Sequence, residues 1–253
     1  MCIVFIAIKQ HAQYPLIIAA NRDEFFTRPT TPSHFWQAKP RILAGIDQQA
    51  GGTWMGINNQ GHIAALTNIR SPYNVLPKAL SRGKLVKDYL QSPHDGYHTQ
   101  LQHTRNNFNG YNLLFGPWQN LQVYNNQLDQ LTPLPPGFYG LSNASLNSPW
   151  PKLTSGRELF ADYCRSAQSI DDHALFSLLR NNTQADDALL PDTGVSAEWE
   201  RRLSSIFVES SDYGTRSSTV LKIDNHHHVY WRERSYGSAA QFVSEQSFEF
   251  DII

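Results

Sequence analysis

The sequence predicts an α+β fold in a single domain that spans residues 1–253. Three observations support this prediction. Strand patterns occupy both ends of the chain, helical patterns lie between them, and no internal stretch has the composition of a linker. We therefore expect the two chain ends to pair in a common sheet, with residues 2–8 in a central strand.

The first seventy residues are patterned as strands and turns. Apolar runs at residues 2–8 and 14–20 flank a polar segment and predict a β-hairpin. Residues 28–40 contain three prolines and predict a loop. Further strands are expected at residues 42–46, 53–57 and 62–68.

Helical spacing of apolar residues begins after residue 80. It predicts helices at residues 81–90, 153–165, 171–181 and 196–207, with Ser81 as the N-cap of the first. Strands are expected at residues 111–115, 121–124, 217–223, 227–233 and 246–250. Residues 133–151 hold five prolines, too many for a regular helix.

The composition argues against several classes of protein. Hydrophobic residues make up 40% of the chain, and 21 basic residues balance 22 acidic ones. Such a chain can bury a core and is not of the disordered type. The near-neutral charge argues against nucleic-acid binding, and no apolar run approaches the roughly 18 residues of an integral membrane segment. Two cysteines and no clear secretory signal favour a reducing, cytoplasmic location.

Cys2 points most directly to a chemical function. If Met1 is removed, the α-amino group of Cys2 lies two bonds from the carbon that bears the thiol. That amine titrates near about 7.7–8.0, so it can accept the proton of the thiol without a separate histidine. The alternative is a small buried hydrophobic residue at the start of a strand, a common use of free cysteine.

Four polar residues, Asn21-Arg22-Asp23-Glu24, follow the second apolar run. The predicted hairpin brings them beside the N-terminus. There Arg22, Asp23 and Glu24 could orient an amine, form an ion pair or bind a substrate carboxylate. The alternative is a solvated loop with a local salt bridge.

Other polar residues lie at predicted strand ends. Asn68 and Arg70 close the strand at residues 62–68, and Asn143 and Arg216 lie near later strands. Amide side chains can stabilise an oxyanion, and arginine can bind a carboxylate or phosphate through two hydrogen bonds. Taken one at a time, these residues are typical of turns and caps.

No metal site and no covalently bound cofactor are expected. The histidines at residues 226–228 have no further metal ligands nearby in sequence and predict an exposed turn. The chain also lacks the Cys-x-x-Cys-His motif of covalent haem attachment. Cys164 lies on an apolar helical face, which indicates a core position.

An ordered set of motifs resembles the NRDE family, the transport and Golgi organisation protein family named after the tetrad. The matching segments are residues 1–3, 21–24, 51–56, 66–70, 81–86, 109–114, 140–143, 149–152 and 213–216. They come in order and cover residues 1 to about 220. Such an ordered set is a specific indication of the family, whereas a single tetrad would be a weak one.

The resemblance implies a four-layer αββα sandwich of the N-terminal nucleophile hydrolase type. It is most similar to the branch that cleaves bile-salt amides and penicillin side chains. Cys2 falls where that branch keeps its nucleophile, and Asn68 matches its oxyanion asparagine. Asn143 and Arg216 match its later asparagine and arginine.

One departure from that branch concerns the tetrad. The branch has Arg-x-x-Asp after its second strand, whereas Asn21 and Glu24 occupy the equivalent spacing here. The acidic residue that would orient Cys2 is therefore either Asp23 or Glu24.

Two functions follow from the resemblance, because the NRDE family is linked to intracellular haem movement and to lipid and coenzyme-A homeostasis. The first is binding and transfer of haem or a similar amphipathic ligand. The second is a Cys2-dependent hydrolase of amides or thioesters, acting on acyl compounds. The residues expected to bind a ligand are Asn21, Arg22, Glu24, Trp54 and Arg70. The residues expected to act in catalysis are Cys2, Asp23, Asn68, Asn143 and Arg216.

The alternation of strand residues predicts which side of the tetrad faces Cys2. Asn21 and Asp23 share one side, and Arg22 and Glu24 share the other. We expect Asn21 and Asp23 to lie on the side of Cys2, because an acidic group favours the charged form of the N-terminal amine.

Overall fold

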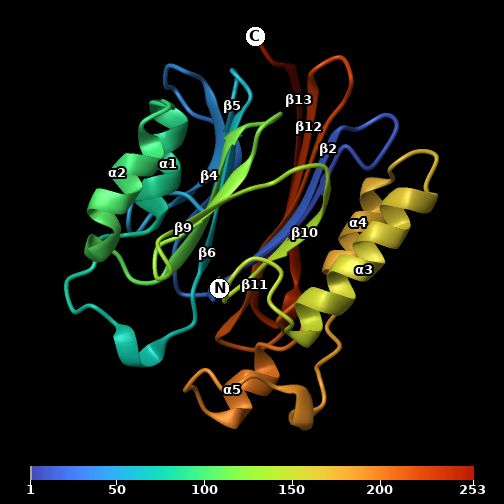
Figure 1. Ribbon diagram of the computed structural model, residues 1–253. Coiled ribbons are helices and arrows are strands. Elements are labelled where there is room, and N and C mark those ends of the chain that lie inside the picture. Colours follow the sequence, from blue (N-terminus) through green and yellow to red (C-terminus); the bar gives the residue numbers. More distant parts are fainter. Residues whose placement is uncertain (1) are drawn as a thin grey trace. The chain divides into compact units, whose positions relative to one another are not determined.

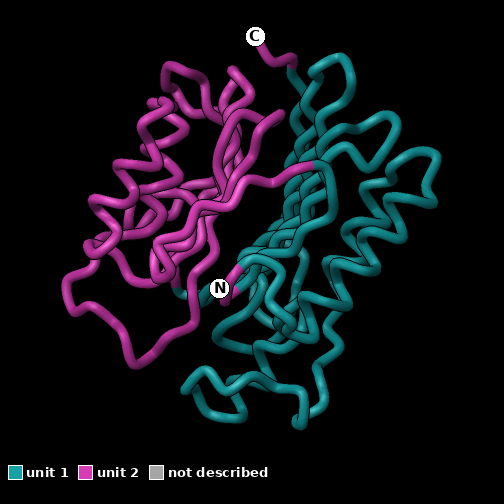
Figure 2. The backbone as a smooth tube through the Cα atoms, in the orientation of Figure 1, with its two compact units in different colours: residues 1–27, 136–142, 146–250 teal, residues 28–135, 143–145, 251–253 magenta. Residues whose placement is uncertain are grey.

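The computed structural model describes residues 2–253, which form two compact units (Figure 2). The described residues of the first unit are 2–27, 136–142 and 146–250. The second unit comprises residues 28–135, 143–145 and 251–253. A single domain over residues 1–253 stays a prediction.

The sheet of the first unit has six strands in the order β10-β1-β2-β11-β12-β13 (Figure 1). The strands are β1 (Cys2–Ile8), β2 (Leu16–Phe25), β10 (Gly137–Leu141), β11 (Tyr213–Ile223), β12 (His228–Tyr236) and β13 (Phe242–Asp251). β1 pairs antiparallel with β2 on one side and β10 on the other. The first and last strands therefore share a sheet and β1 is an interior strand, as predicted.

Two helices cover one face of this sheet, α3 (Pro151–Ser166) and α4 (Asp172–Leu179) (Figure 1). Pro151 stands in the first turn of α3, where its missing N–H is not needed, and the Asp171 carboxylate caps α4. The strand residues Ile3 and Phe5 pack against them. Cys164 of α3 belongs to this core, as predicted. The remaining helical pieces of the unit are α5 (Ala197–Arg202), η3 (Asp187–Leu189) and η4 (Ser238–Ala240).

The second unit contains a seven-stranded antiparallel sheet in the order β3-β4-β5-β6-β7-β8-β9. The strands are β3 (Thr30–Phe35), β4 (Ile42–Asp47), β5 (Met55–Asn58), β6 (His62–Asn68), β7 (Tyr111–Pro117), β8 (Gln122–Asn125) and β9 (Gln130–Pro133). The helices are α1 (Gly83–Gln91), α2 (Tyr97–Thr104), η1 (Pro72–Asn74) and η2 (Arg105–Asn107). α1 and α2 lie along this sheet and share a core with it (Figure 1).

Each unit thus supplies one sheet and one helical layer, and the predicted α+β class is confirmed. Among residues 2–253, no helix has both the length and the apolar character that a membrane crossing requires.

Several predicted boundaries are wrong. β2 continues to Phe25, so the tetrad at residues 21–24 is the end of a strand and not a loop after it. Residues 28–40 contain the strand β3, which tolerates Pro32 because it lies at the edge of its sheet. α1 starts at Gly83 with Arg82 at its N-cap, so Ser81 is not the cap. The helix predicted at residues 196–207 ends at Arg202.

Candidate functional site

One row of side chains crosses three neighbouring strands of the first unit. Cys2 of β1 lies directly opposite Arg22 of β2, and Arg22 lies directly opposite Ser217 of β11. Directly opposed residues of antiparallel strands project to the same face, with Cβ atoms about 4.5–5.5 Å apart. A thiol, a guanidinium and a hydroxyl therefore stand side by side on one face of the sheet. We call these three residues the Cys2 row.

A β-bulge places a second arginine beside the row. The register between β2 and β11 shifts between Thr215 and Ser217, so Arg216 is the extra residue. Its guanidinium donates to the carbonyl oxygen of Phe25 at 2.9 Å. Burial lowers the pKa of Arg216, and the nearby Arg22 charge lowers it further. Two guanidinium groups thus lie near one another at this end of the sheet.

Glu24 lies at the same end of β2. Its carboxylate accepts a hydrogen bond of 2.9 Å from the Phe25 amide. The charge of Glu24 raises the pKa of Arg216, opposing the effect of burial and of Arg22. Glu24 therefore partly offsets the positive charge around the bulge.

Asn21 has a structural role on the opposite face of the sheet. Its amide nitrogen donates to the carbonyl oxygens of Leu179, at 2.8 Å, and Ile206, at 2.9 Å. Its amide oxygen accepts a 2.6 Å hydrogen bond from Ser218. Leu179 is the last residue of α4, where carbonyl groups lack helical partners. Asn21 therefore joins the sheet to the end of α4.

Asp23 is a buried carboxylate, 2% exposed. It accepts a 2.7 Å hydrogen bond from the Thr215 hydroxyl. Burial raises the pKa of Asp23, while the nearby charges of Lys152 and Arg22 and the Thr215 hydrogen bond oppose this rise. Lys152 is itself buried and donates to the carbonyl oxygen of Leu203 at 2.8 Å.

Cys2 is half-buried at the start of β1. Burial raises the pKa of its thiol, and the Asp23 carboxylate acts in the same direction. The Arg22 charge and a hydrogen bond from the Asp23 backbone amide favour the thiolate but do not reverse the rise. The hydroxyl of Ser142 in unit 1 donates to the Cys2 carbonyl oxygen at 3.0 Å, which fixes the backbone next to the thiol.

The strand register contradicts the prediction that Asn21 lies on the side of Cys2, whereas the Asp23 carboxylate does act on the Cys2 thiol. Asn21 and Asp23 do alternate with Arg22, but Arg22 is the residue opposite Cys2. Asn21 instead lies opposite Ile3, whose side chain packs into the core with α3 and α4. Because directly opposed residues project to the same face, Asn21 faces the core with Ile3, and Arg22 shares the face of Cys2.

The remaining predicted residues belong to the second unit. The Asn143 side-chain amide donates to the Asn68 carbonyl oxygen at 2.9 Å, and the Arg70 amide donates to the Asn143 carbonyl oxygen at 2.8 Å. These three residues therefore form one connected group. Trp54 is buried, and its ring packs against the backbone of Gly45. No cluster of His, Cys, Asp or Glu within residues 2–253 has the arrangement of a metal site.

Sequence reasoning overlooked the hydroxyl groups of β11 and the buried Lys152. Thr215, Ser217 and Ser218 are all buried in a strand whose later part is apolar. The run of polar residues at 215–219, directly before the apolar part of the strand, could have indicated these hydroxyl groups from the sequence. Lys152 stood in the motif at residues 149–152, but nothing local indicated its proximity to Asp23.

Comparison with solved structures identifies the fold. A C2A mutant of conjugated bile acid hydrolase from Clostridium perfringens matches with a TM-score of 0.52 and 10% identity, covering 100% of this chain and 92% of that one. An N-acylethanolamine-hydrolyzing acid amidase orthologue from Caenorhabditis elegans matches with a TM-score of 0.50 and 11% identity, covering 87% and 92%. The chain thus has the fold of the N-terminal nucleophile hydrolases.

Sequence comparison then gives the family. The family model described as Transport and Golgi organisation 2 matches residues 1–238. The Transport and Golgi organization protein 2 homolog of Bos taurus is 35% identical over 258 residues, covering 93% of each chain. The chain belongs to the Transport and Golgi organisation 2 family, as the resemblance to the NRDE motifs predicted.

Proposed function

We propose that this protein binds an amphipathic anion, with haem as the first candidate, on the sheet face that carries the Cys2 row. The observation that supports this most is the alignment of Cys2, Arg22 and Ser217 across three strands. A guanidinium binds a carboxylate through two parallel hydrogen bonds, and a hydroxyl adds a further donor. The row is therefore suited to hold a ligand carboxylate beside a thiol.

The second arginine supports a ligand with two acidic groups. Burial lowers the pKa of Arg216, and repulsion from the nearby positive charge of Arg22 lowers it further. An anion bound between them would relieve this repulsion. Haem carries two propionates, and its iron accepts cysteine thiolate as a ligand. The arginines suit the propionates and Cys2 suits the iron.

We further place this binding in haem trafficking in the cytoplasm. The support is family membership, together with two cysteines that form no disulfide. A carrier must release its ligand, and a thiol whose pKa burial raises holds iron less firmly than a preformed thiolate.

Haemin titration of the purified protein tests this proposal. We expect Arg22→Met to weaken binding at least about tenfold, because a charge-assisted hydrogen bond is lost. The measurement is the Soret band, and Arg201→Met, at a surface ion pair with Asp187, is the matched control. Cys2→Ala should shift the Soret maximum, whereas Cys164→Ala should not. Equal affinities of the Arg22 and Arg201 variants would overturn the assignment of the site.

A Cys2-dependent amide or thioester hydrolase is the second candidate. The observation that favours it is the Asp23 backbone amide, which hydrogen-bonds the Cys2 thiol. Once Met1 is removed, the Cys2 α-amine takes the thiol proton while sulfur attacks the carbonyl carbon. The leaving group departs with that proton, and water then releases the acid and restores the thiol. The raised thiol pKa ranks this candidate second.

In this second proposal Asn68 and Asn143 stabilise the oxyanion, Asp23 positions the amine and Arg216 binds the acyl substrate. Incubation with an N-acyl amino acid and with an acyl thioester should then leave an acyl group on Cys2, detected by intact-mass spectrometry. Asn68→Ala should slow turnover about a hundredfold. Retention of Met1 on every protein molecule isolated from cells would exclude this mechanism.

A further inference from the structure

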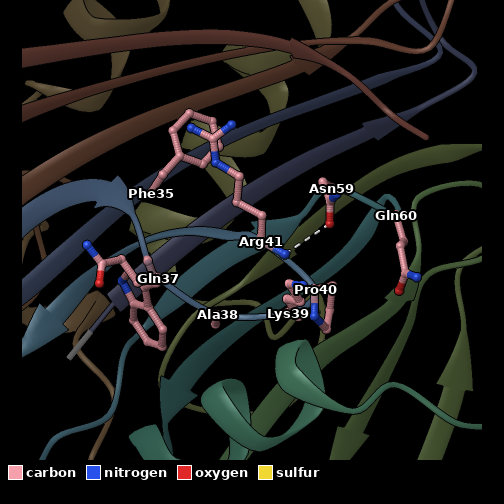
Figure 3. Close-up of a pocket in the computed structure, with 9 residues that line it drawn as sticks. Phe35, Gln37, Ala38, Lys39, Pro40, Arg41, Asn59 and Gln60 are labelled. Carbon is pink, nitrogen blue, oxygen red and sulfur yellow. Dashed lines mark hydrogen bonds between the residues drawn. The ribbon is translucent and has the colours of Figure 1, made fainter.

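A pocket lies in the second unit, between the loop that joins β3 to β4 and the turn that joins β5 to β6 (Figure 3). Its volume is about 870 Å³, within the range of small-molecule sites. The nine lining residues are Phe35, Trp36, Gln37, Ala38, Lys39, Pro40, Arg41, Asn59 and Gln60. None of them belongs to the Cys2 row or to the residues predicted from the sequence.

Hydrogen bonds hold the walls of this pocket in place. The Arg41 amide donates to the Asn59 side-chain oxygen at 3.1 Å, and the Asn59 amide donates back to the Arg41 carbonyl oxygen at 2.9 Å (Figure 3). The Trp36 indole donates to the Ala44 carbonyl oxygen at 2.9 Å. Trp36 and Ala38 also pack against the core of the second unit. The pocket is therefore preformed, with an apolar floor.

The charges at the rim are all positive. Lys39 and Arg41 line the pocket, and no acidic residue does. The Arg41 guanidinium lies over the Phe35 ring (Figure 3), and its central carbon is 3.7 Å from the centre of the ring. Within residues 2–253, neither Lys39 nor Arg41 forms an ion pair with a carboxylate.

A second pocket, in the first unit, provides a contrast. There Arg165 lies 4.8 Å from the centre of the Phe138 ring, a comparable stacked arrangement. However, Asp162 lies 3.6 Å from Arg165, and Glu158 also lines that pocket. Its positive charge is already balanced by acidic side chains. Of these two pockets, the one at Arg41 combines a stacked guanidinium with a lining that contains no acidic residue.

We propose that the Arg41 pocket binds a small organic anion in which a carboxylate or phosphate is attached to a flat ring system. The Arg41 guanidinium, oriented by Phe35, presents its N–H groups to the acidic group, and Lys39 adds a second positive charge. The ring lies on the apolar floor at Trp36, and the amides of Gln37 and Gln60 can bond its polar edges. This binding is separate from the proposed function of the Cys2 row.

Isothermal titration calorimetry with four probes tests this inference. The probes are 2-naphthoate and adenosine monophosphate, each paired with its neutral analogue, 2-naphthylmethanol and adenosine. We expect at least one anion to bind at least tenfold more tightly than its neutral analogue. The anion that binds more tightly tells whether a carboxylate or a phosphate is the preferred group.

Variants assign the binding to the pocket. Arg41→Met should weaken binding of the anion at least tenfold. The control Arg165→Met changes the stacked arginine of the other pocket and should leave this binding unchanged. Arg22→Met, which changes the Cys2 row, should also leave it unchanged. Arg41 is exposed, and thermal melting checks that the variant is folded; Lys39→Gln is the second test and should weaken binding severalfold. Failure of both anions to saturate at millimolar concentration, or equal binding by the Arg41 and Arg165 variants, would overturn the proposal.

Discussion

Asn21→Ala is expected to lower the free energy of unfolding by about 4 kcal/mol, because it removes three buried hydrogen bonds at once. The carbonyl groups of Leu179 and Ile206 and the hydroxyl of Ser218 would all lose their Asn21 partner. Each such loss in a buried position costs about 1–3 kcal/mol. Urea denaturation followed by circular dichroism measures the change.

Ser218→Ala is the graded control for this prediction. It removes only the 2.6 Å hydrogen bond to the Asn21 amide oxygen, so it should cost about 1 kcal/mol. If Asn21→Ala is no more destabilising than Ser218→Ala, the carbonyl contacts at the end of α4 do not have the structural role that we assign to them. The first residue of the tetrad would then be free for another function.

Gly52→Ala is expected to lower the free energy of unfolding by about 3 kcal/mol, at the upper end of the usual cost of overpacking. A Cβ atom at Gly52 would lie 2.5 Å from the carbonyl carbon of Gly83 and 2.9 Å from the amide nitrogen of Lys84. Both are backbone atoms of α1 and cannot move aside as a side chain can. The Thr53 amide also donates to the Gly83 carbonyl oxygen at 3.1 Å, which holds the two segments together.

Gly96→Ala is the matched control in the same unit. Gly96 stands at the N-cap of α2, and a Cβ atom there would meet nothing closer than 3.5 Å. We expect a change within about 0.5 kcal/mol. Equal melting temperatures for the two variants would show that α1 can shift away from residue 52 without cost.

Local sequence patterns predicted most helices and strands, because buried positions are mostly apolar and recur with the period of the element. The apolar run at residues 2–8 and the strand predicted at residues 62–68 match β1 and β6 at both ends. The helical spacing at residues 153–165 lies within α3. α2 was missed because only Tyr97 and Leu101 of its eight residues are buried, too few to show a helical period.

The α+β class, the family motifs and the candidate catalytic and ligand-binding residues could be predicted from the sequence, because they depend on residue type and local order. Tertiary structure alone decided which of those residues share a face. A shift of one residue in the register of a hairpin moves every side chain to the other face, so the register of β1 and β2 decides which tetrad residue accompanies Cys2. Pairing with β11, nearly two hundred residues later in the chain, completes the Cys2 row with Ser217. Such long-range pairing leaves no local signal, so Arg22, and not Asn21, stands beside Cys2.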